Sequence, residues 1–127
     1  MGSGVVLDSP AILAVLFNER GSDEIMPLLE GALVSAVNLA ELHASLVRRG
    51  VDADVAWGQL HELGCEFCPM DEEQARIAGE MAGQRRTVGL SLGDRACLAL
   101  AIERKASVYT TNAAWRILGL GIDVEVK

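Results

Sequence analysis

The chain has 127 residues, half of them hydrophobic and only 4% aromatic, and a formal net charge of −7. This length predicts one domain with an aliphatic core, and the composition excludes an intrinsically disordered chain. The negative charge argues against indiscriminate binding to nucleic acid, although eleven basic residues could still cluster locally.

The N-terminal half alternates short apolar runs with helical patterns. The predicted elements, in chain order, are a strand over 5–7, helices over 11–17 and 22–29, a strand over 33–36, and helices over 39–49 and 52–63. Ser9 is expected to N-cap the first helix. Pro10 is expected at the first helical position, where its missing N–H is harmless.

The C-terminal half continues the alternation. The predicted elements are a strand over 66–69, a helix over 71–81 opened by a capping box, a polar loop over 83–89, a helix beginning at Ser91, a strand over 107–109, a short helix over 113–118 and a strand over 122–126. Strands that alternate with helices imply a mostly parallel sheet covered on both faces. We therefore expect a single three-layer α/β/α domain over 1–127 with about five strands.

No membrane partner is expected, and the cytoplasm is the default location. No charged stretch followed by an apolar one suggests a signal peptide, and no run reaches the roughly 18 apolar residues of a spanning helix. Residues 1–4 are expected to be in part a cloning addition. The basic pairs are expected to be solvated helix ends or loops: Arg48-Arg49, Arg85-Arg86 and Arg104-Lys105.

Acidic side chains stand at three strand-to-helix junctions. Asp94 lies in the first turn of an otherwise apolar helix, Asp8 closes the apolar run 5–7, and Glu41 lies one turn into the helix after 33–36. Carboxylates seldom approach a core without a partner. Ligands of parallel sheets bind outside the carboxyl ends of the strands, so these acids and Asn112 are expected at one edge.

Such a pocket suits a divalent metal ion. Mg²⁺ and Mn²⁺ prefer oxygen ligands, and crowded carboxylates raise one another's pKa unless a cation compensates them. A metal at this edge could acidify a water for attack on a phosphodiester and stabilise the leaving oxygen.

Helix capping is the competing interpretation of the same residues. Asn38-x-x-Glu41 and Ser91-x-x-Asp94 both match capping boxes, and Asn112 could N-cap the helix over 113–118. Capping does not explain Asp8, because Ser9 is expected to cap the first helix.

The cysteines are expected to pack in the core. Three cysteines are an odd number and do not predict a disulfide framework. Cys65 and Cys68 form a CxxC pattern, but a zinc site needs a second pair of ligands and a thioredoxin-type site begins at a helix N-terminus.

Four blocks of the sequence, 5–14, 35–42, 89–101 and 109–115, resemble the motif blocks of PIN-domain nucleases, most of all the VapC toxins of bacterial toxin–antitoxin pairs. The resemblance implies an endoribonuclease that depends on Mg²⁺ or Mn²⁺. It also implies inhibition by a cognate VapB-like antitoxin, and usually a homodimer.

The resemblance also assigns site residues. It implies metal roles for Asp8, Glu41 and Asp94, and a fourth catalytic position at Asn112, where the family commonly has Asp. An amide oxygen can bind a metal or orient a water but carries no charge. Hydrogen bonds that orient the metal ligands are hypothesised from four further side chains: Ser9, Asn38, Ser91 and Thr110.

Two other functions fit parts of this pattern. A PIN scaffold that binds RNA or an antitoxin, with weak or no cleavage because of Asn112, is the closer alternative. A phospho-receiver domain has the same length and alternation. It requires paired acids after the first strand, whereas Ser9-Pro10 follows Asp8, and a phosphorylatable Asp after the third, where Cys68-Pro69 stands.

Overall fold

The computed structural model describes residues 4–127, apart from the side chain of Ile117. Residues 1–3 of the expected cloning addition therefore lie outside the described residues. The core of the fold is a five-stranded sheet in which every paired strand is parallel to its neighbour. Its strands are β1 (Val5–Leu7), β2 (Leu33–Ser35), β3 (Glu66–Cys68), β4 (Ser107–Thr110) and β5 (Val124–Val126). They lie in the order β3-β2-β1-β4-β5.

Helices connect all the strands except β4 and β5, which are joined through a 3₁₀ helix. The α-helices are α1 (Ser9–Leu16), α2 (Ser22–Ile25), α3 (Ala36–Arg48), α4 (Ala53–His61), α5 (Glu72–Met81) and α6 (Leu92–Arg104). Two 3₁₀ helices complete the set, η1 (Met26–Leu28) and η2 (Ala113–Ile117). The expected helix over 22–29 divides into α2 and η1 because Pro27 has no N–H to continue an α-helical ladder.

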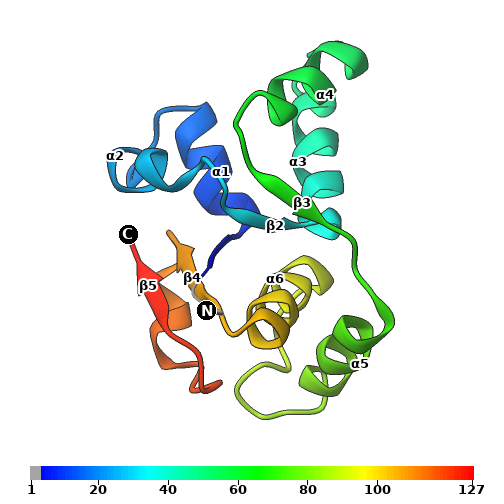
Figure 1. Ribbon diagram of the computed structural model, residues 1–127, viewed down its shortest axis with the longest axis vertical. Coiled ribbons are helices and arrows are strands. Elements are labelled where there is room, and N and C mark those ends of the chain that lie inside the picture. The colour runs from blue at the N-terminus through cyan, green and yellow to red at the C-terminus, as the bar shows by residue number, and fades with distance from the viewer. Residues whose placement is uncertain (1–3) are drawn as a thin grey trace.

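The helices form two layers with the sheet between them. The helices α1 to α4 lie on one side of the sheet and α5 and α6 on the other (Figure 1). One apolar core joins α1, α3 and α4 to the inward side chains of the sheet, including Leu7 and Val34. A second core joins α6 and η2 to the opposite face, including Val6 and Val108. The predicted three-layer α/β/α fold is confirmed.

The connections reverse direction between β1 and β4. From β1 the chain steps outward through β2 to β3, and β4 then returns to the other side of β1, with β5 outside it. Leu7 pairs with Tyr109, so the next residues, Asp8 and Thr110, stand level at the carboxyl ends of the two strands. In open parallel sheets this switch point is where ligands bind.

Two helix starts differ from the prediction. The N-cap of α1 is Asp8 rather than Ser9, because the Asp8 side chain accepts the N–H of Ala11 and Ser9 is the first helical residue. Pro10 is therefore the second residue of the helix and not the first. The expected capping box at Asn38 is also wrong, because α3 starts earlier and is capped by Ser35.

The remaining elements agree with the prediction within two residues or so at each end. Asp71 caps α5, although the side chain of Gln74 turns away from a reciprocal cap and donates to Glu103 at 2.8 Å. The last strand begins at Val124, two residues later than expected. Among residues 4–127, none of the helices has the length and apolar composition of a membrane span.

Candidate functional site

Asp8 is the central side chain of the switch point. It is 1% exposed, and both of its carboxylate oxygens accept hydrogen bonds. The N–H of Ala11 donates to Oδ1 at 2.9 Å, and the Thr110 hydroxyl donates to Oδ2 at 2.5 Å. The backbone N–H of Asn112 donates to the same Thr110 hydroxyl oxygen at 3.0 Å. A continuous chain of hydrogen bonds therefore links Asp8, Thr110 and Asn112.

Burial makes the charged form of Asp8 unfavourable. Burial raises the pKa of this carboxyl from its ordinary value of 3.8 to about 6, and the nearby charge of Asp94 acts in the same direction. The hydrogen bonds from Thr110 and Ala11 oppose the rise, because they stabilise the carboxylate. The site thus holds an acid whose charge is only partly compensated by neutral donors.

Glu41 is held from two sides. The Ser9 hydroxyl donates to Glu41 Oε1 at 2.9 Å, and the Asn38 amide donates to the same oxygen at 3.0 Å. Asn38, which is 1% exposed, also donates to the carbonyl of Gly93 at 3.1 Å. These contacts place the Glu41 carboxylate against the first turn of α6, where the helix dipole favours a negative charge.

The approach of Glu41 to α6 depends on a glycine. A Cβ atom at Gly93 would lie 2.2 Å from Glu41 Oε2 and 2.3 Å from Oε1, so only a residue without a side chain leaves room for the carboxylate. Sequence reasoning did not identify Gly93. A glycine in the first turn of an otherwise continuous apolar helix was the available signal.

Asp94 closes the N-terminus of α6. Its carboxylate accepts the N–H of Ser91 at 3.1 Å, and the Ser91 hydroxyl accepts the N–H of Asp94 at 3.2 Å. The expected capping box at Ser91 is therefore present. Capping does not exclude a second role, because one carboxylate oxygen is enough for the cap and Asp94 is half-buried at the edge that holds Asp8.

Cys97 is a buried thiol of α6 whose pKa is affected by all three acids. Its thiol is fully buried, and its pKa is raised well above the ordinary range, first by burial and then by the charges of Asp8, Asp94 and Glu41. The hydrogen bonds from Ser9 and Asn38 to Glu41, and from Asn38 to Gly93, bring the starts of α1, α3 and α6 to this same edge. The sequence pattern placed Cys97 in the apolar helix but did not place it under the acids.

Within residues 4–127 the three acids have no basic partner. Among the described residues, the ion pairs are those of Arg76 with Glu73 and Glu80, on the surface of α5. No three acidic, histidine or cysteine side chains of residues 4–127 converge on one ion position. In this arrangement Glu41 is turned to Ser9 and Asn38, and Asp94 to Ser91. The acids share one edge without forming a closed ligand shell.

The donor set is nevertheless of the kind that a hard divalent cation binds. The side chains at this edge offer carboxylate, hydroxyl and amide oxygens, which suit Mg²⁺ and Mn²⁺. Asn38 Oδ1 is also buried without a hydrogen-bond donor among the described residues. An uncompensated, buried carboxylate beside two other acids is stabilised by a cation. The residues present therefore fit such an ion.

Asn112 lies near this edge, but its side chain has another partner. Its Oδ1 accepts the N–H of Ala114 at 3.1 Å and caps η2, as the capping interpretation predicted. Asn112 is connected to Asp8 by its backbone N–H, which donates to the Thr110 hydroxyl that in turn donates to Asp8. The structure thus places Asn112 beside the acids as a helix cap.

The CxxC cysteines have the properties of packed thiols. Burial raises the pKa of Cys65 to about 11, and Cys68 is 2% exposed in the core with its pKa raised in the same way. Reactive cysteines have lowered pKa values, so the upward shifts agree with the predicted packing role of both thiols.

Comparison with protein families finds one that covers most of the chain. The model of the PIN domain matches residues 5–119. None of the curated proteins compared by sequence matches.

Solved structures share the fold over the whole chain. A chain in the crystal structure of VapBC2 from Rickettsia felis, bound to a DNA fragment from the promoter, is 16% identical, with 97% of this chain and 98% of that one covered and a TM-score of 0.75. A chain of DNA-bound VapBC from Salmonella typhimurium is 18% identical, with 97% of each chain covered and a TM-score of 0.74. A chain of VapBC-5 from Mycobacterium tuberculosis is 22% identical, with 99% and 98% covered and a TM-score of 0.59. At these identities the likeness shows a common fold.

Proposed function

Because this chain belongs to the PIN domain family, we propose that it is a VapC-like endoribonuclease that hydrolyses RNA phosphodiester bonds with Mg²⁺ or Mn²⁺. The observation that carries the proposal is the buried Asp8 carboxylate at the switch point of the sheet. It shares its edge with Glu41 and Asp94, and no basic side chain of the described residues pairs with any of the three. A divalent cation is the partner that this arrangement lacks.

The three acids would hold the ion, and neighbouring groups would orient them. A bound Mg²⁺ or Mn²⁺ would supply an acidified water and charge stabilisation for in-line displacement at phosphorus. Thr110 fixes one oxygen of Asp8, and Ser91 fixes one oxygen of Asp94. Each hydrogen bond leaves a carboxylate lone pair directed elsewhere, and donors of this kind commonly orient metal ligands.

Glu41 is positioned by donors rather than by a basic residue. Ser9 and Asn38 hold its Oε1, while Oε2 lies over Gly93 at the start of α6. This leaves Oε2 free to accept a further partner without loss of the hydrogen bonds to Oε1. The orienting roles hypothesised for Ser9, Asn38, Ser91 and Thr110 are thus supported by hydrogen bonds to the three acids.

Asn112 bears on the alternative of a binding module that cleaves weakly or not at all. The Asn112 side chain caps η2, so its amide oxygen is occupied. An aspartate at this position would cap η2 equally well and would add a negative charge beside Asp8. In our proposal three acids are sufficient for cleavage, and Asn112 tunes the affinity for the ion without being required for it.

An antitoxin is proposed as the inhibitory partner. The structural neighbours are toxin–antitoxin complexes, and an arginine from such a partner would form strong charge-assisted hydrogen bonds with the uncompensated acids.

We also propose a homodimer and a cytoplasmic location. Most of the apolar surface of α1 is covered, whereas large apolar side chains are exposed elsewhere: Met26, Val47, Val55, Trp57, Val88 and Leu92. Light scattering at high concentration tests the dimer, which a monodisperse monomer would refute.

The proposed activity is tested by RNA cleavage. Purified protein is incubated with a panel of structured and single-stranded RNAs in Mg²⁺, in Mn²⁺ and in EDTA, alongside Asp8→Asn and the control Asp71→Asn. Asp71 caps α5 through the same kind of hydrogen bond as Asp8 makes in α1, so it matches both the chemistry and the local geometry. We expect cleavage only with metal, its loss in Asp8→Asn, and its retention in Asp71→Asn. Undiminished cleavage in EDTA would refute the proposal.

A further inference from the structure

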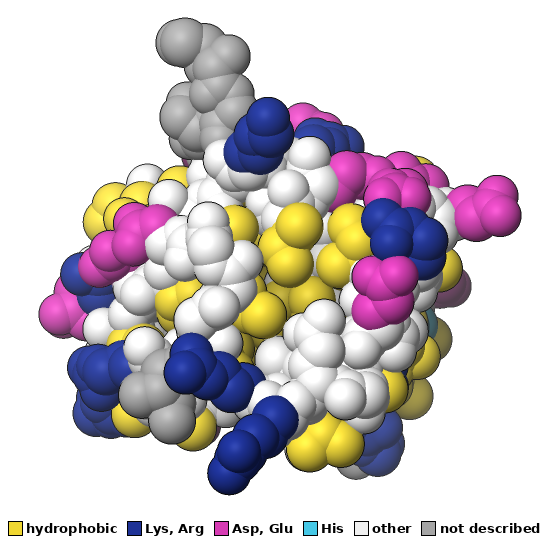
Figure 2. Space-filling model, turned by 90° about the horizontal axis from the view of Figure 1, so that it is seen from below, with side chains coloured by type: hydrophobic (Ala, Val, Ile, Leu, Met, Phe, Trp, Pro, Cys, Tyr) yellow, Lys and Arg dark blue, Asp and Glu magenta, His cyan; other side chains and the backbone are white. Residues whose placement is uncertain are grey.

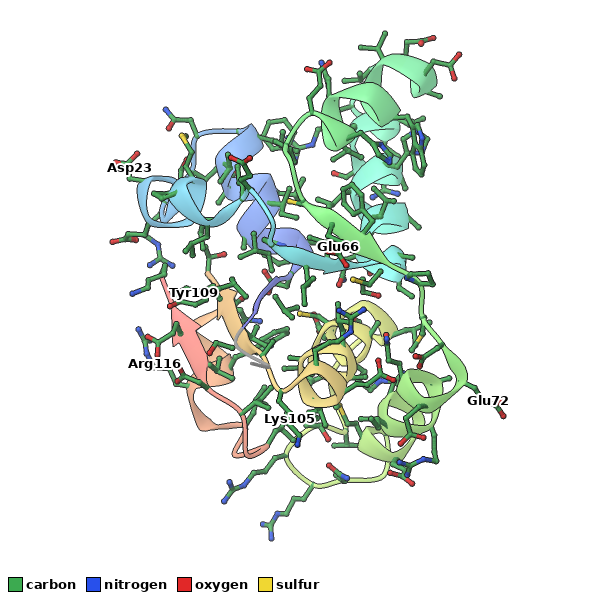
Figure 3. All side chains as sticks on the ribbon, viewed as in Figure 1. Asp23, Glu66, Glu72, Lys105, Tyr109 and Arg116 are labelled. Atoms are coloured by element: carbon green, nitrogen blue, oxygen red, sulfur yellow. The ribbon has the colours of Figure 1, made fainter. Side chains whose placement is uncertain are left out.

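A pocket of about 820 Å³ opens between η2 and the connection from α5 to α6. Its wall carries Arg85 and Arg86 from the connection and Arg116 from η2, together with Asn112 and Trp115. Arg116 is labelled on η2 in Figure 3. The volume falls within the range of small-molecule sites, which is about 300–1,000 Å³. The sequence suggested that Arg85 and Arg86 are solvated, and they are indeed exposed, but they share this pocket.

The three guanidinium groups of the pocket have no partners among the described residues. The ion pairs of residues 4–127 all involve Arg76, which lies on α5 outside the pocket, and within these residues no side-chain hydrogen bond is formed by Arg85, Arg86 or Arg116. In a chain with 18 acidic and 11 basic residues, three unpaired arginines around one pocket make a local positive site. Figure 2 views the molecule from the side of the α5–α6 connection and shows Lys and Arg side chains gathered along its lower edge.

The pocket adjoins the acidic edge. Asn112 lines the pocket, and its backbone N–H donates to Thr110, whose hydroxyl donates to Asp8. Arg86 reaches across the pocket to the chain after η2, where a Cβ atom at Gly119 would lie 2.2 Å from Arg86 Nη1. None of the three acids lines the pocket, but Asn112 and Thr110 connect it to Asp8, so a ligand held by the arginines has the acidic edge as its neighbour.

The remaining wall of the pocket is mostly apolar. Leu90, Trp115 and Leu118 contribute to it, and the indole N–H of Trp115 is buried without an acceptor among the described residues. Three fork-shaped guanidinium donors suit phosphate oxygens, which they can bind in a bidentate manner. Trp115 and Leu118 are almost fully buried, so the contact area for a base or a ribose ring comes mainly from Leu90 and Ala114.

We propose that this pocket binds a nucleotide of single-stranded RNA that flanks the phosphodiester at the acidic edge. The phosphate lies against Arg85, Arg86 and Arg116, and the nucleoside rests on the apolar wall. This inference rests on the proposed nuclease function, because it assigns the neighbouring segment of the same substrate. It also explains how an acidic protein binds a polyanion, since the positive charge is concentrated beside the site rather than spread over the surface.

The inference is tested by measuring RNA binding under conditions in which the RNA cannot be cleaved. A fluorescent, 2′-O-methylated single-stranded oligonucleotide of about eight nucleotides, a length typical of single-strand sites, is titrated in EDTA and followed by fluorescence anisotropy. The variants are Arg85→Ala/Arg86→Ala, Arg116→Ala and the control Arg104→Ala. Arg104 is exposed in the last turn of α6, does not line the pocket, and its removal changes the charge by the same amount as Arg116→Ala. The arginines are exposed, so thermal unfolding of every variant is expected to match that of the parent.

We expect the double variant to bind the oligonucleotide about tenfold more weakly or worse. The plot of log K against log salt should also become less steep by about 1.4, which is about 0.7 for each lost phosphate contact. Arg116→Ala shows the same trend, and Arg104→Ala binds within twofold of the parent. Parental affinity in both Arg85→Ala/Arg86→Ala and Arg116→Ala would overturn the inference. So would a labelled hexaglutamate peptide that binds as tightly and with the same dependence on the arginines.

The same experiments distinguish failure of the nuclease proposal from failure of the pocket inference. Arginine-dependent binding of the oligonucleotide by a protein that cleaves no RNA would support the pocket and refute the nuclease. Intact metal-dependent cleavage with arginine-independent binding would refute the pocket alone.

Discussion

The Thr110 hydroxyl donates a hydrogen bond of 2.5 Å to Asp8 Oδ2, across 102 residues of sequence. The two side chains follow neighbouring strands, β1 and β4, at the point where the connections of the sheet reverse. Thr110 is fully buried and also accepts the N–H of Asn112. This hydrogen bond therefore ties the buried acid to the segment that starts η2, and the candidate site depends on both ends of the chain.

Replacement of Thr110 by valine tests this link. Thr110→Val keeps the shape of the side chain but leaves Asp8 Oδ2 and the Asn112 N–H without a partner. We expect the free energy of unfolding to fall by about 1–3 kcal/mol, as for unsatisfied buried groups, and RNA cleavage to fall with it. Urea denaturation and the cleavage assay measure the two effects. Thr111→Val, a neighbouring residue without these hydrogen bonds, should change neither, and equal losses in both variants would contradict the link.

The raised pKa of Asp8 predicts how stability depends on pH. Its pKa is about 6 in the folded protein against an ordinary value of 3.8, so the folded state binds the proton more tightly than the unfolded state. Without metal, the contribution of Asp8 to stability is therefore most favourable below pH 4. This contribution falls as the pH rises toward 6 and is constant above, with a total loss of about 3 kcal/mol.

Asp8→Asn should remove this pH dependence. Asparagine keeps the cap of α1 and cannot ionise, so the variant should be more stable than the parent in EDTA at pH 8 and should not cleave RNA. Urea denaturation from pH 4 to pH 8 measures the difference. A variant that is less stable than the parent at pH 8 would contradict burial of an uncompensated charge.

Gly93 should be required for activity but not for folding. In Gly93→Ala the new methyl group displaces the Glu41 carboxylate, which is the end of a flexible side chain, while alanine favours the helix by up to about 1 kcal/mol. We expect cleavage to fall by about tenfold or more, because small displacements of a catalytic group are costly, with stability retained. Gly79→Ala in α5, where a Cβ atom meets nothing within 4 Å, is the matched control. Full activity of Gly93→Ala would show that the position of Glu41 is unimportant.

Asn112→Asp distinguishes an active nuclease, in which Asn112 only modulates metal affinity, from a binding module that Asn112 has made inactive. Aspartate preserves the cap of η2 and adds a charge near Asp8, so we expect tighter binding of Mn²⁺ and cleavage that is equal to or above the parental level. Calorimetric titration with Mn²⁺ and the cleavage assay measure these effects. A parent without activity whose Asn112→Asp variant cleaves RNA would favour the disabled binding module. Unchanged affinity for Mn²⁺ would show that Asn112 acts only as a cap.

The sequence predicted the architecture well because the signals were local and redundant. The strands at 5–7 and 66–68 and the caps at Asp71 and Ser91 each follow from a few adjacent residues. The alternation of strands and helices then implied the parallel sheet. The resemblance to the PIN domain family, drawn from four short blocks, is confirmed.

Helix starts near the site were harder to predict because several adjacent residues can cap. Asp8 and Ser9 are both good N-caps, and tertiary contacts decide between them: Ser9 turns to Glu41, which leaves Asp8 to cap α1. Asn38 likewise lies inside α3 because it contacts Gly93 of α6, a residue 55 positions away. Contacts over such separations leave no periodic pattern in the sequence. The pocket around Arg85, Arg86 and Arg116 was missed for the same reason.

The most direct test of the account is where a divalent ion binds. A crystal of the protein soaked in Mn²⁺ is measured at a wavelength at which manganese scatters anomalously, and Asp94→Asn crystals are treated in the same way. We expect one anomalous peak at the switch point, with carboxylate oxygens of Asp8 and Asp94 at about 2 Å, as in inner-shell coordination. The peak should be weakened or lost in Asp94→Asn. Absence of a peak at this edge, or a peak that persists unchanged in Asp94→Asn, would contradict the proposed metal-dependent nuclease.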